Sequence, residues 1–236
     1  MFESMCRSIR SAHADLGHSL GWSFLYTPKE SFRPNQQLLF VGLNPAGNAY
    51  SEDYECEEGN AYLCDDWGSG AGKAPLQQQI QMLYRAIADE SDGHVAFEVL
   101  MERTLAANYV PFRSRNWPSL RDPEGSLSFS RSLWSRISDV VQARVVIAMG
   151  TVPYRELLSL LKSKAWALAS GDEGNARLEW GRQTYSLAKL QNGGKAMLLV
   201  RLPHLSRYRL FSRPQCRPAL TLIAREVAVA LNACSL

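Results

Sequence analysis

The feature that most constrains the fold is a set of three short, uninterrupted apolar runs that lie far apart in the chain. They are Leu38–Val41, Val145–Met149 and Ala196–Val200. Each has the length of a strand and is continuous rather than alternating, which is typical of strands buried on both faces of a parallel sheet. Stretches with apolar residues at helical spacing separate them. Strands that alternate with helices predict an α/β fold, a three-layer α/β/α sandwich with a short, mostly parallel central sheet.

The remaining elements follow from periodicity and breakers. We expect helices over about 1–20, 76–90, 94–104, 129–142, 152–163 and 217–232, and a strand over 105–112 that Pro111 ends. Alternation over 176–190 around Gly181 predicts a hairpin or flap. The composition of residues 45–75 predicts a long loop after the first strand. We expect one domain over residues 1–236, because no repeat or linker divides the chain.

Composition excludes several classes of protein. With 46% hydrophobic and 21% charged residues, the chain can fill a core and is not disordered. No apolar run approaches the ~20 residues of a membrane span, and residues 1–10 lack the apolar region of a secretory signal. Five cysteines without a CxxC pair argue against a disulfide framework, an iron–sulfur cluster or structural zinc. We therefore expect a reducing, cytoplasmic setting, no membrane partner and no metal.

Charge is divided unevenly along the chain. Residues 1–100 carry 6 Lys/Arg against 14 Asp/Glu, whereas residues 101–236 carry 20 against 9, and 16 of those 20 are arginine. Arginine suits phosphate recognition because its guanidinium is a planar fork of donors. The asymmetry favours an anionic partner such as nucleic acid on one face.

Polar side chains follow three of the predicted strands. Gly42-Leu43-Asn44-Pro45-Ala46-Gly47 comes after the first strand, Asn108 belongs to the second, and His204-Leu205-Ser206-Arg207-Tyr208-Arg209 comes after the last. The carboxyl ends of parallel strands meet at one edge of a sheet, where α/β folds place their sites. We therefore expect these three segments to converge.

Together the three segments resemble the uracil-DNA glycosylase superfamily. Gly42-Leu43-Asn44-Pro45 is similar to its first motif in the Asn-Pro version of mismatch-specific and single-strand-selective members. His204-Leu205-Ser206 is similar to its His-Pro-Ser motif, with Leu205 in place of proline, and Asn108 stands where the family reads the flipped base. The resemblance covers about residues 38–232. The chain lacks the four-cysteine pattern of the iron–sulfur branches of the superfamily.

The resemblance implies a monofunctional DNA glycosylase that needs no cofactor and no obligate protein partner. Asn44 would position the attacking water, and His204 would donate a hydrogen bond to the departing base. Gly42, Ala46, Tyr62 and Asn108 would surround that base, which must leave the DNA stack. No lysine stands in the three motifs to form a Schiff base, so lyase chemistry is not expected.

Position 46 bears on which base is removed. Strict uracil enzymes of the superfamily carry a tyrosine after the proline, which blocks substituents at carbon 5, whereas this chain has Ala46. The pocket would then admit uracil, mismatched thymine or a 5-modified cytosine. The alternative is that Tyr50 or Tyr62 fills the space.

The segment 52–66 holds seven carboxylates in 15 residues: Glu52, Asp53, Glu55, Glu57, Glu58, Asp65 and Asp66. A solvated face is the plainest interpretation, and the spacing fits no standard loop for a divalent cation. A third hypothesis is that these carboxylates bind the hydroxyls of a sugar attached to the base. Glucosylated hydroxymethylcytosine of phage DNA is such a base, and its removal would be antiviral defence.

The predicted DNA contacts flank the strand ends. Tyr208, Arg209 and Leu210 follow the His204 motif where the family inserts a wedge into the gap left by the flipped base. Ser206 and Arg207 are further predicted DNA contacts in the same segment. The expected phosphate contacts are Arg113, Arg115, Arg201, Arg207, Arg213 and Arg217, each of which has solvated arginine as its alternative. Trp117 and Trp134 are assigned to the core, and His13 and His18 to the surface.

Each of the three motif residues also fits a purely structural role. Asn44 before a proline can shape a turn, His204 can be a structural histidine, and Asn108 can cap a strand. Two further functions fit the pattern: a non-catalytic nucleic-acid binder on the same fold, and a hydrolase of free nucleosides or nucleotides. The first keeps DNA affinity without forming an abasic product, and the second releases base from monomers.

Overall fold

The computed structural model describes residues 1–91, 95–169 and 175–232. Within them, a mixed sheet has the strand order β2-β1-β3-β7-β6-β4, and β5 pairs with β6. β1 (Leu38–Gly42), β2 (Thr104–Asn108), β3 (Val145–Met149) and β7 (Lys195–Leu202) run parallel. The remaining strands are antiparallel to their neighbours: β6 (Thr184–Asn192), β4 (Ala167–Leu168) and β5 (Ala176–Arg177). The α/β class and the mostly parallel sheet are confirmed.

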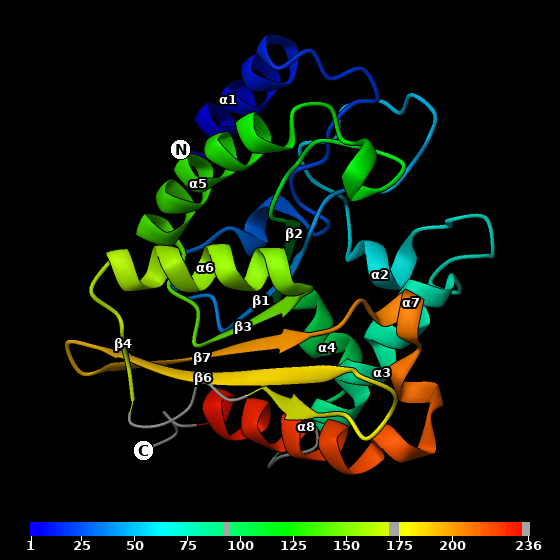
Figure 1. Ribbon diagram of the computed structural model, residues 1–236, viewed down its shortest axis with the longest axis vertical. Coiled ribbons are helices and arrows are strands. Elements are labelled where there is room, and N and C mark those ends of the chain that lie inside the picture. The colour runs from blue at the N-terminus through cyan, green and yellow to red at the C-terminus, as the bar shows by residue number, and fades with distance from the viewer. Residues whose placement is uncertain (92–94, 170–174, 233–236) are drawn as a thin grey trace.

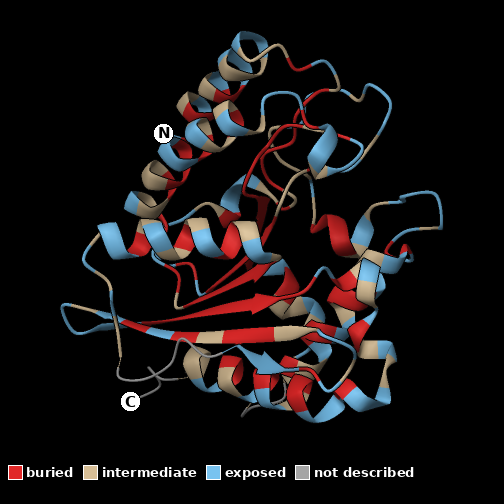
Figure 2. Ribbon diagram, viewed as in Figure 1, coloured by how far each residue is buried: buried red, intermediate tan, exposed pale blue. Residues whose placement is uncertain are grey.

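Helices cover both faces of the sheet (Figure 1). α1 (Phe2–Asp15), α5 (Pro123–Val140) and α6 (Thr151–Ser163) lie on one face, and α3 (Pro75–Asp89), α4 (Phe97–Glu102) and α8 (Arg217–Asn232) on the other. Successive strand residues point to opposite faces, so Leu39 and Val41 pack into the first layer and Leu38 and Phe40 into the second. β1, β2, β3 and most of β7 are therefore buried on both sides, as Figure 2 shows.

Several boundaries differ from the sequence-based expectation. The first helix ends at Asp15 rather than near 20, because Gly17 has a φ of 68° and turns the chain. The helix expected from 129 begins at Pro123, where the side chain of Asp122 accepts a hydrogen bond from Gly125 N at 2.9 Å. The helix expected over 94–104 is α4, and residue 94 lies outside the described residues.

The structure also differs from the strand expected over 105–112 and from the loop expected over 45–75. β2 ends at Asn108, although Tyr109 N and Val110 N still donate to Gly42 O and Leu43 O. The expected loop 45–75 contains a short helix, α2 (Ala61–Cys64), which Asn60 caps by accepting from Tyr62 N. The hairpin expected around Gly181 is confirmed as the β5–β6 pair. Among the described residues, no helix combines the length and apolarity needed to cross a bilayer.

Candidate active site

The carboxyl ends of the parallel strands bring the three motif segments to one edge of the sheet. Gly42 of β1 pairs with Asn108 of β2, and Met149 of β3 pairs with Leu202 of β7, two residues before His204. β3 is the single strand between β1 and β7, so their backbones are about 10 Å apart. In Figure 1 the arrows of β3 and β7 point to the same side of the molecule, toward α7 (Leu205–Tyr208).

Asn44 lies two residues beyond β1, and three acceptors fix the orientation of its amide. Its Nδ2 donates to Ser114 Oγ at 2.8 Å, to Pro45 O at 3.1 Å and, at 3.4 Å, to the carbonyl of Phe112. Backbone carbonyls only accept hydrogen bonds, so the NH₂ group must face them. Asn44 Oδ1 consequently points the other way, and no group in the described parts of the chain donates to it.

Asn108 is buried at the end of β2 and lies across the end of β1. It is 7% exposed, and a Cβ atom built on Gly42 would come within 2.2 Å of its Oδ1. The same Cβ would lie 3.8 Å from the Cε of Met149. Gly42, Asn108 and Met149 therefore form one contact surface between the Asn44 segment and the end of β3.

An aromatic cluster stands beside Asn108. Tyr26 stacks on Tyr62 with ring centroids 5.7 Å apart, and Phe40 and Trp67 meet Tyr62 edge to face at 5.6 Å. Burial raises the pKa of Tyr26 to about 12, against smaller opposing effects of the Arg113 cation and of hydrogen bonds with Ser23 and Asn108. Tyr62 is 3% exposed, Tyr26 is half-buried and Trp67 is 37% exposed, so Trp67 is the most exposed member of the cluster.

Ala46 is exposed, and its neighbours are Ser114 and Arg113. It forms a parallel bridge with Ser114, and its carbonyl accepts from Arg113 Nη1 at 2.6 Å. Tyr50 is 69% exposed, and Tyr62 is held in the aromatic cluster.

Arg113 and Arg115 differ in what they contact. Arg113 also donates to Ser23 Oγ at 3.4 Å, and its Nε is buried without a partner among the described residues. The Arg113 guanidinium therefore links the loop at Ala46 to the segment at Ser23. Arg115 is exposed and remains a predicted phosphate contact.

His204 begins the segment that follows β7, and it is exposed to solvent. Its Nδ1 lies 3.1 Å from Ser206 Oγ. Desolvation by the surrounding protein lowers the pKa of His204, and the Arg207 cation adds to the effect, so the neutral imidazole is favoured. When Ser206 donates to Nδ1, the ring proton sits on Nε2, which can then donate a hydrogen bond to a bound molecule.

The residues after Ser206 separate into exposed and buried ones. Arg207 and Arg209 are exposed, Arg209 with a φ of 47°, and Tyr208 is half-buried against Trp180. Leu210 is completely buried in the core, so the expectation that it lines the wedge is wrong. Of the other predicted phosphate contacts, Arg201 is 8% exposed and donates to Asn175, Thr184 and Ser186.

The acidic segment uses several carboxylates for local structure. Asp53 accepts from Trp22 N, Glu55 pairs with Arg10 at 3.2 Å, and Asp66 accepts from three backbone amides of its own turn. Glu57 and Asp65 are half-buried near each other. Burial raises the pKa of Glu57 to about 6, with a contribution from Asp65.

The described residues contain no group of three or more His, Cys, Asp or Glu side chains able to hold a metal ion. Cys6, Cys56, Cys64 and Cys216 are free thiols, and Cys234 lies outside the described residues.

The assignment of His18 to the surface is wrong, and His13 is half-buried. His18 is 9% exposed, its ring stacks on Phe112 with centroids 4.3 Å apart, and its Nε2 lies 3.0 Å from Ser126 Oγ. Burial lowers the pKa of His18 to about 4, with a further contribution from His13. Trp134 is in the core as expected, whereas Trp117 is half-buried and packs against the edge of the same core cluster.

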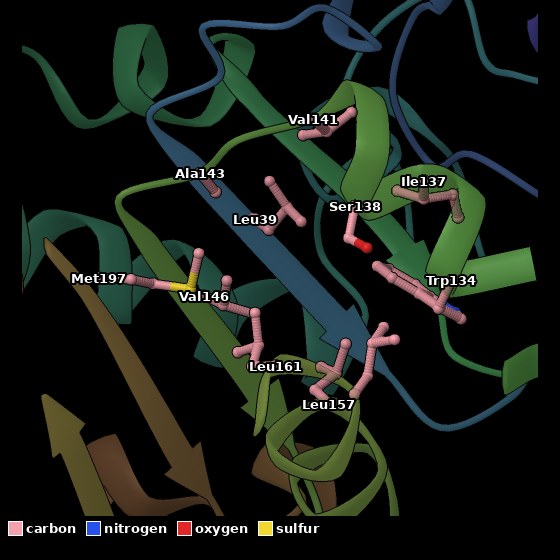
Figure 3. Close-up of a pocket in the computed structure, with 11 residues that line it drawn as sticks. Leu39, Trp134, Ile137, Ser138, Val141, Ala143, Val146, Leu157, Leu161 and Met197 are labelled. Carbon is pink, nitrogen blue, oxygen red and sulfur yellow. The ribbon is translucent and has the colours of Figure 1, made fainter. Parts of the chain in front are cut away.

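A cavity lies away from this edge, between the sheet, α5 and α6 (Figure 3). Its volume is about 30 Å³, and its walls are almost entirely apolar, with Leu39, Val146 and Met197 from the amino-terminal parts of their strands. An apolar space of this size is a packing gap.

The structure thus adds Ser114, Tyr26 and Met149 to the residues expected at the site. Ser114 Oγ accepts from Asn44 and donates to Asn116 O at 2.9 Å, which makes it the direct support of the Asn44 amide. No sequence pattern marks a serine six residues after a strand as such a support. Comparisons with models of protein families and with curated proteins found no match to this chain.

Proposed function

We propose that this protein is a monofunctional DNA glycosylase that hydrolyses the N-glycosidic bond of a flipped pyrimidine and leaves an abasic site. The observation that carries the proposal is the Asn44 amide. Its NH₂ group is held by Ser114 and two carbonyls, and its Oδ1 has no donor among the described residues. An acceptor fixed in this way can hold a water molecule for attack on the sugar.

His204 and Asn108 complete the proposed chemistry. Bond cleavage leaves negative charge on the departing base, and a donor placed at its carbonyl oxygen is worth about 3 kcal/mol by comparison with oxyanion-hole donors. The neutral His204, with Nδ1 engaged by Ser206, supplies that donor from Nε2. Asn108 presents an amide with both donor and acceptor at the same edge of the sheet.

The substrate we propose is uracil, mismatched thymine or a 5-modified cytosine. The small, exposed side chain of Ala46 supports a pocket open at carbon 5. Glu57, Asp65 and the exposed Trp67 near Tyr62 are the groups that suit a sugar-bearing base such as glucosylated hydroxymethylcytosine. DNA is the partner, no metal or cofactor takes part in these steps, and the setting we propose is cytoplasmic.

An abasic-site assay tests the proposal. Matched duplexes carry uracil, a G·T mismatch, 5-hydroxymethylcytosine or its glucosylated form, and alkali converts abasic sites to strand breaks. Breaks that depend on both Asn44 and His204 support the glycosylase, and the preferred base separates repair from antiviral defence. DNA binding without breaks would favour a non-catalytic binder, and base release from free nucleosides would favour a monomer hydrolase.

A further inference from the structure

The segment between β7 and α8 carries His204 but contains little regular structure. It consists of α7 and two short 3-10 turns, Leu210–Ser212 and Pro214–Cys216. Leu205, Leu210 and Cys216 anchor it, because each of these side chains is completely buried in the core. Residues 206–209 lie between two of these anchors and include exposed side chains.

The β5–β6 hairpin reaches this segment from another part of the chain. Leu178 anchors the hairpin in the core, where it is completely buried, and its N donates to Gln183 O at 3.0 Å. The turn between them carries Trp180. Its ring meets Tyr208 edge to face, with centroids 6.2 Å apart.

Two arginines complete the contact. Arg213 Cζ lies 3.6 Å from the centroid of the Trp180 ring, and Arg213 Nε donates to Tyr208 O at 2.9 Å. Arg207 Cζ lies 5.4 Å from the Tyr208 ring. In the described parts of the chain, neither arginine forms an ion pair with a carboxylate. Aromatic rings orient these cations and leave their charge available to an anion.

We propose that Trp180 is a positioning residue that holds the His204–Arg213 segment in the conformation that engages DNA. Trp180 contacts both Tyr208 and Arg213, so it spans the stretch where Arg209 adopts its left-handed conformation. The inference rests on the proposed glycosylase activity. It adds a hairpin that the three motif segments do not include.

Limited proteolysis tests the positioning without any catalysis. Trypsin cleaves after arginine, and a segment released from its support is cut faster. Trp180→Ala should raise the cleavage rate after Arg207 and Arg209 about fivefold, measured by mass spectrometry. The matched control is Trp166→Ala, because Trp166 is also half-buried but packs against the other core layer. Equal cleavage rates in the two variants would overturn the proposal.

Single-turnover kinetics test the consequence for catalysis. Trp180→Ala should lower the rate of base release about tenfold at saturating enzyme and change Kd for DNA less than about threefold. Trp180→Phe should restore most of the rate, because phenylalanine still offers a ring to Arg213. A loss of rate that Trp166→Ala reproduces would contradict the positioning role.

Two further outcomes are distinguishable. If Trp180→Ala does not fold, Arg213→Ala removes the same cation–ring contact, and unchanged cleavage after Arg209 in that variant overturns the proposal. A parent protein that releases no base from any duplex overturns the proposed function, while the proteolysis still decides whether Trp180 holds the segment.

Discussion

The side chain of Asn108 occupies the space that a Cβ atom on Gly42 would need, since Asn108 Oδ1 would lie 2.2 Å from that atom. Gly42↔Asn108 is also the last register pair of β1 and β2. The Asn108 amide can therefore lie across the end of β1 only if residue 42 is a glycine. The backbone dihedral angles of Gly42 do not demand glycine, because its φ is not positive.

Gly42→Ala should displace Asn108 and lower base release by about 100-fold, with a loss of about 1–3 kcal/mol in the free energy of unfolding from overpacking. Urea denaturation and single-turnover rates measure the two effects. The double variant Gly42→Ala/Asn108→Ala should regain stability, because the colliding side chain is gone. Additive losses in stability would show that the two residues do not collide.

Ser114→Ala should reduce catalysis without abolishing it. The substitution removes the 2.8 Å acceptor of Asn44 Nδ2 and leaves the two carbonyl acceptors. We expect about a tenfold fall in the single-turnover rate, against about 100-fold or more for Asn44→Ala. The KM for DNA should stay nearly unchanged, and a Ser114→Ala rate equal to that of the parent would show that the serine does not support the amide.

His204→Ala should lower the rate by about 100-fold, which corresponds to the ~3 kcal/mol of one hydrogen-bond donor. Ser206→Ala should have a smaller effect, because it removes the hydroxyl at Nδ1 but keeps the ring. The ratio of the two losses is the informative quantity. A greater loss in Ser206→Ala would assign the chemistry to the serine.

More of the fold than of the candidate site could be predicted from the sequence. The runs at Leu38–Val41 and Val145–Met149 identify β1 and β3 because continuous apolar sequence has few other uses in a chain of this length. The final helix, α8, follows the expected bounds 217–232. The start of α5 is less accurate, because apolar spacing alone predicts 129, whereas the Asp122-Pro123 pair marks the observed first turn.

Tertiary contacts determine the parts of the site that could not be predicted from the sequence. Asn44 and His204 follow strand ends and Asn108 is the last residue of β2, so topology alone brings their segments to one edge. Ser114 and Trp180 lie in loops, and hydrophobic periodicity does not predict the path of a loop. The absence of a partner at metal spacing predicts a surface position for His18, whereas its stacking on Phe112 depends on a contact 94 residues away.

Buried His18 predicts acid sensitivity. Its pKa is about 4 in the folded protein and 6.5 unfolded, so the unfolded chain binds the extra proton and stability falls as pH drops from 6.5 toward 4. At pH 5 this amounts to about 2 kcal/mol relative to pH 7.5. His18→Gln should lose that much less over the same interval in urea denaturation. Parallel losses in the parent and the variant would exclude His18 as the cause.

Glu57→Gln tests the sugar hypothesis for the acidic segment. The substitution keeps the shape of the side chain and removes its charge, so it should lower the rate on glucosylated hydroxymethylcytosine about tenfold more than the rate on uracil. The paired rates come from single-turnover reactions on otherwise identical duplexes. Equal effects on the two substrates would place Glu57 outside sugar recognition.

In the proposed reaction, water held by Asn44 replaces the base on the sugar. The most direct measurement is mass spectrometry of a reaction run in ¹⁸O-labelled water, with the released base and the abasic strand identified separately. We expect free base and one ¹⁸O atom at C1′ of the abasic sugar, with both products formed at least about 100-fold more slowly by Asn44→Ala. Intact DNA on every duplex, bound by a correctly folded parent protein, would contradict it.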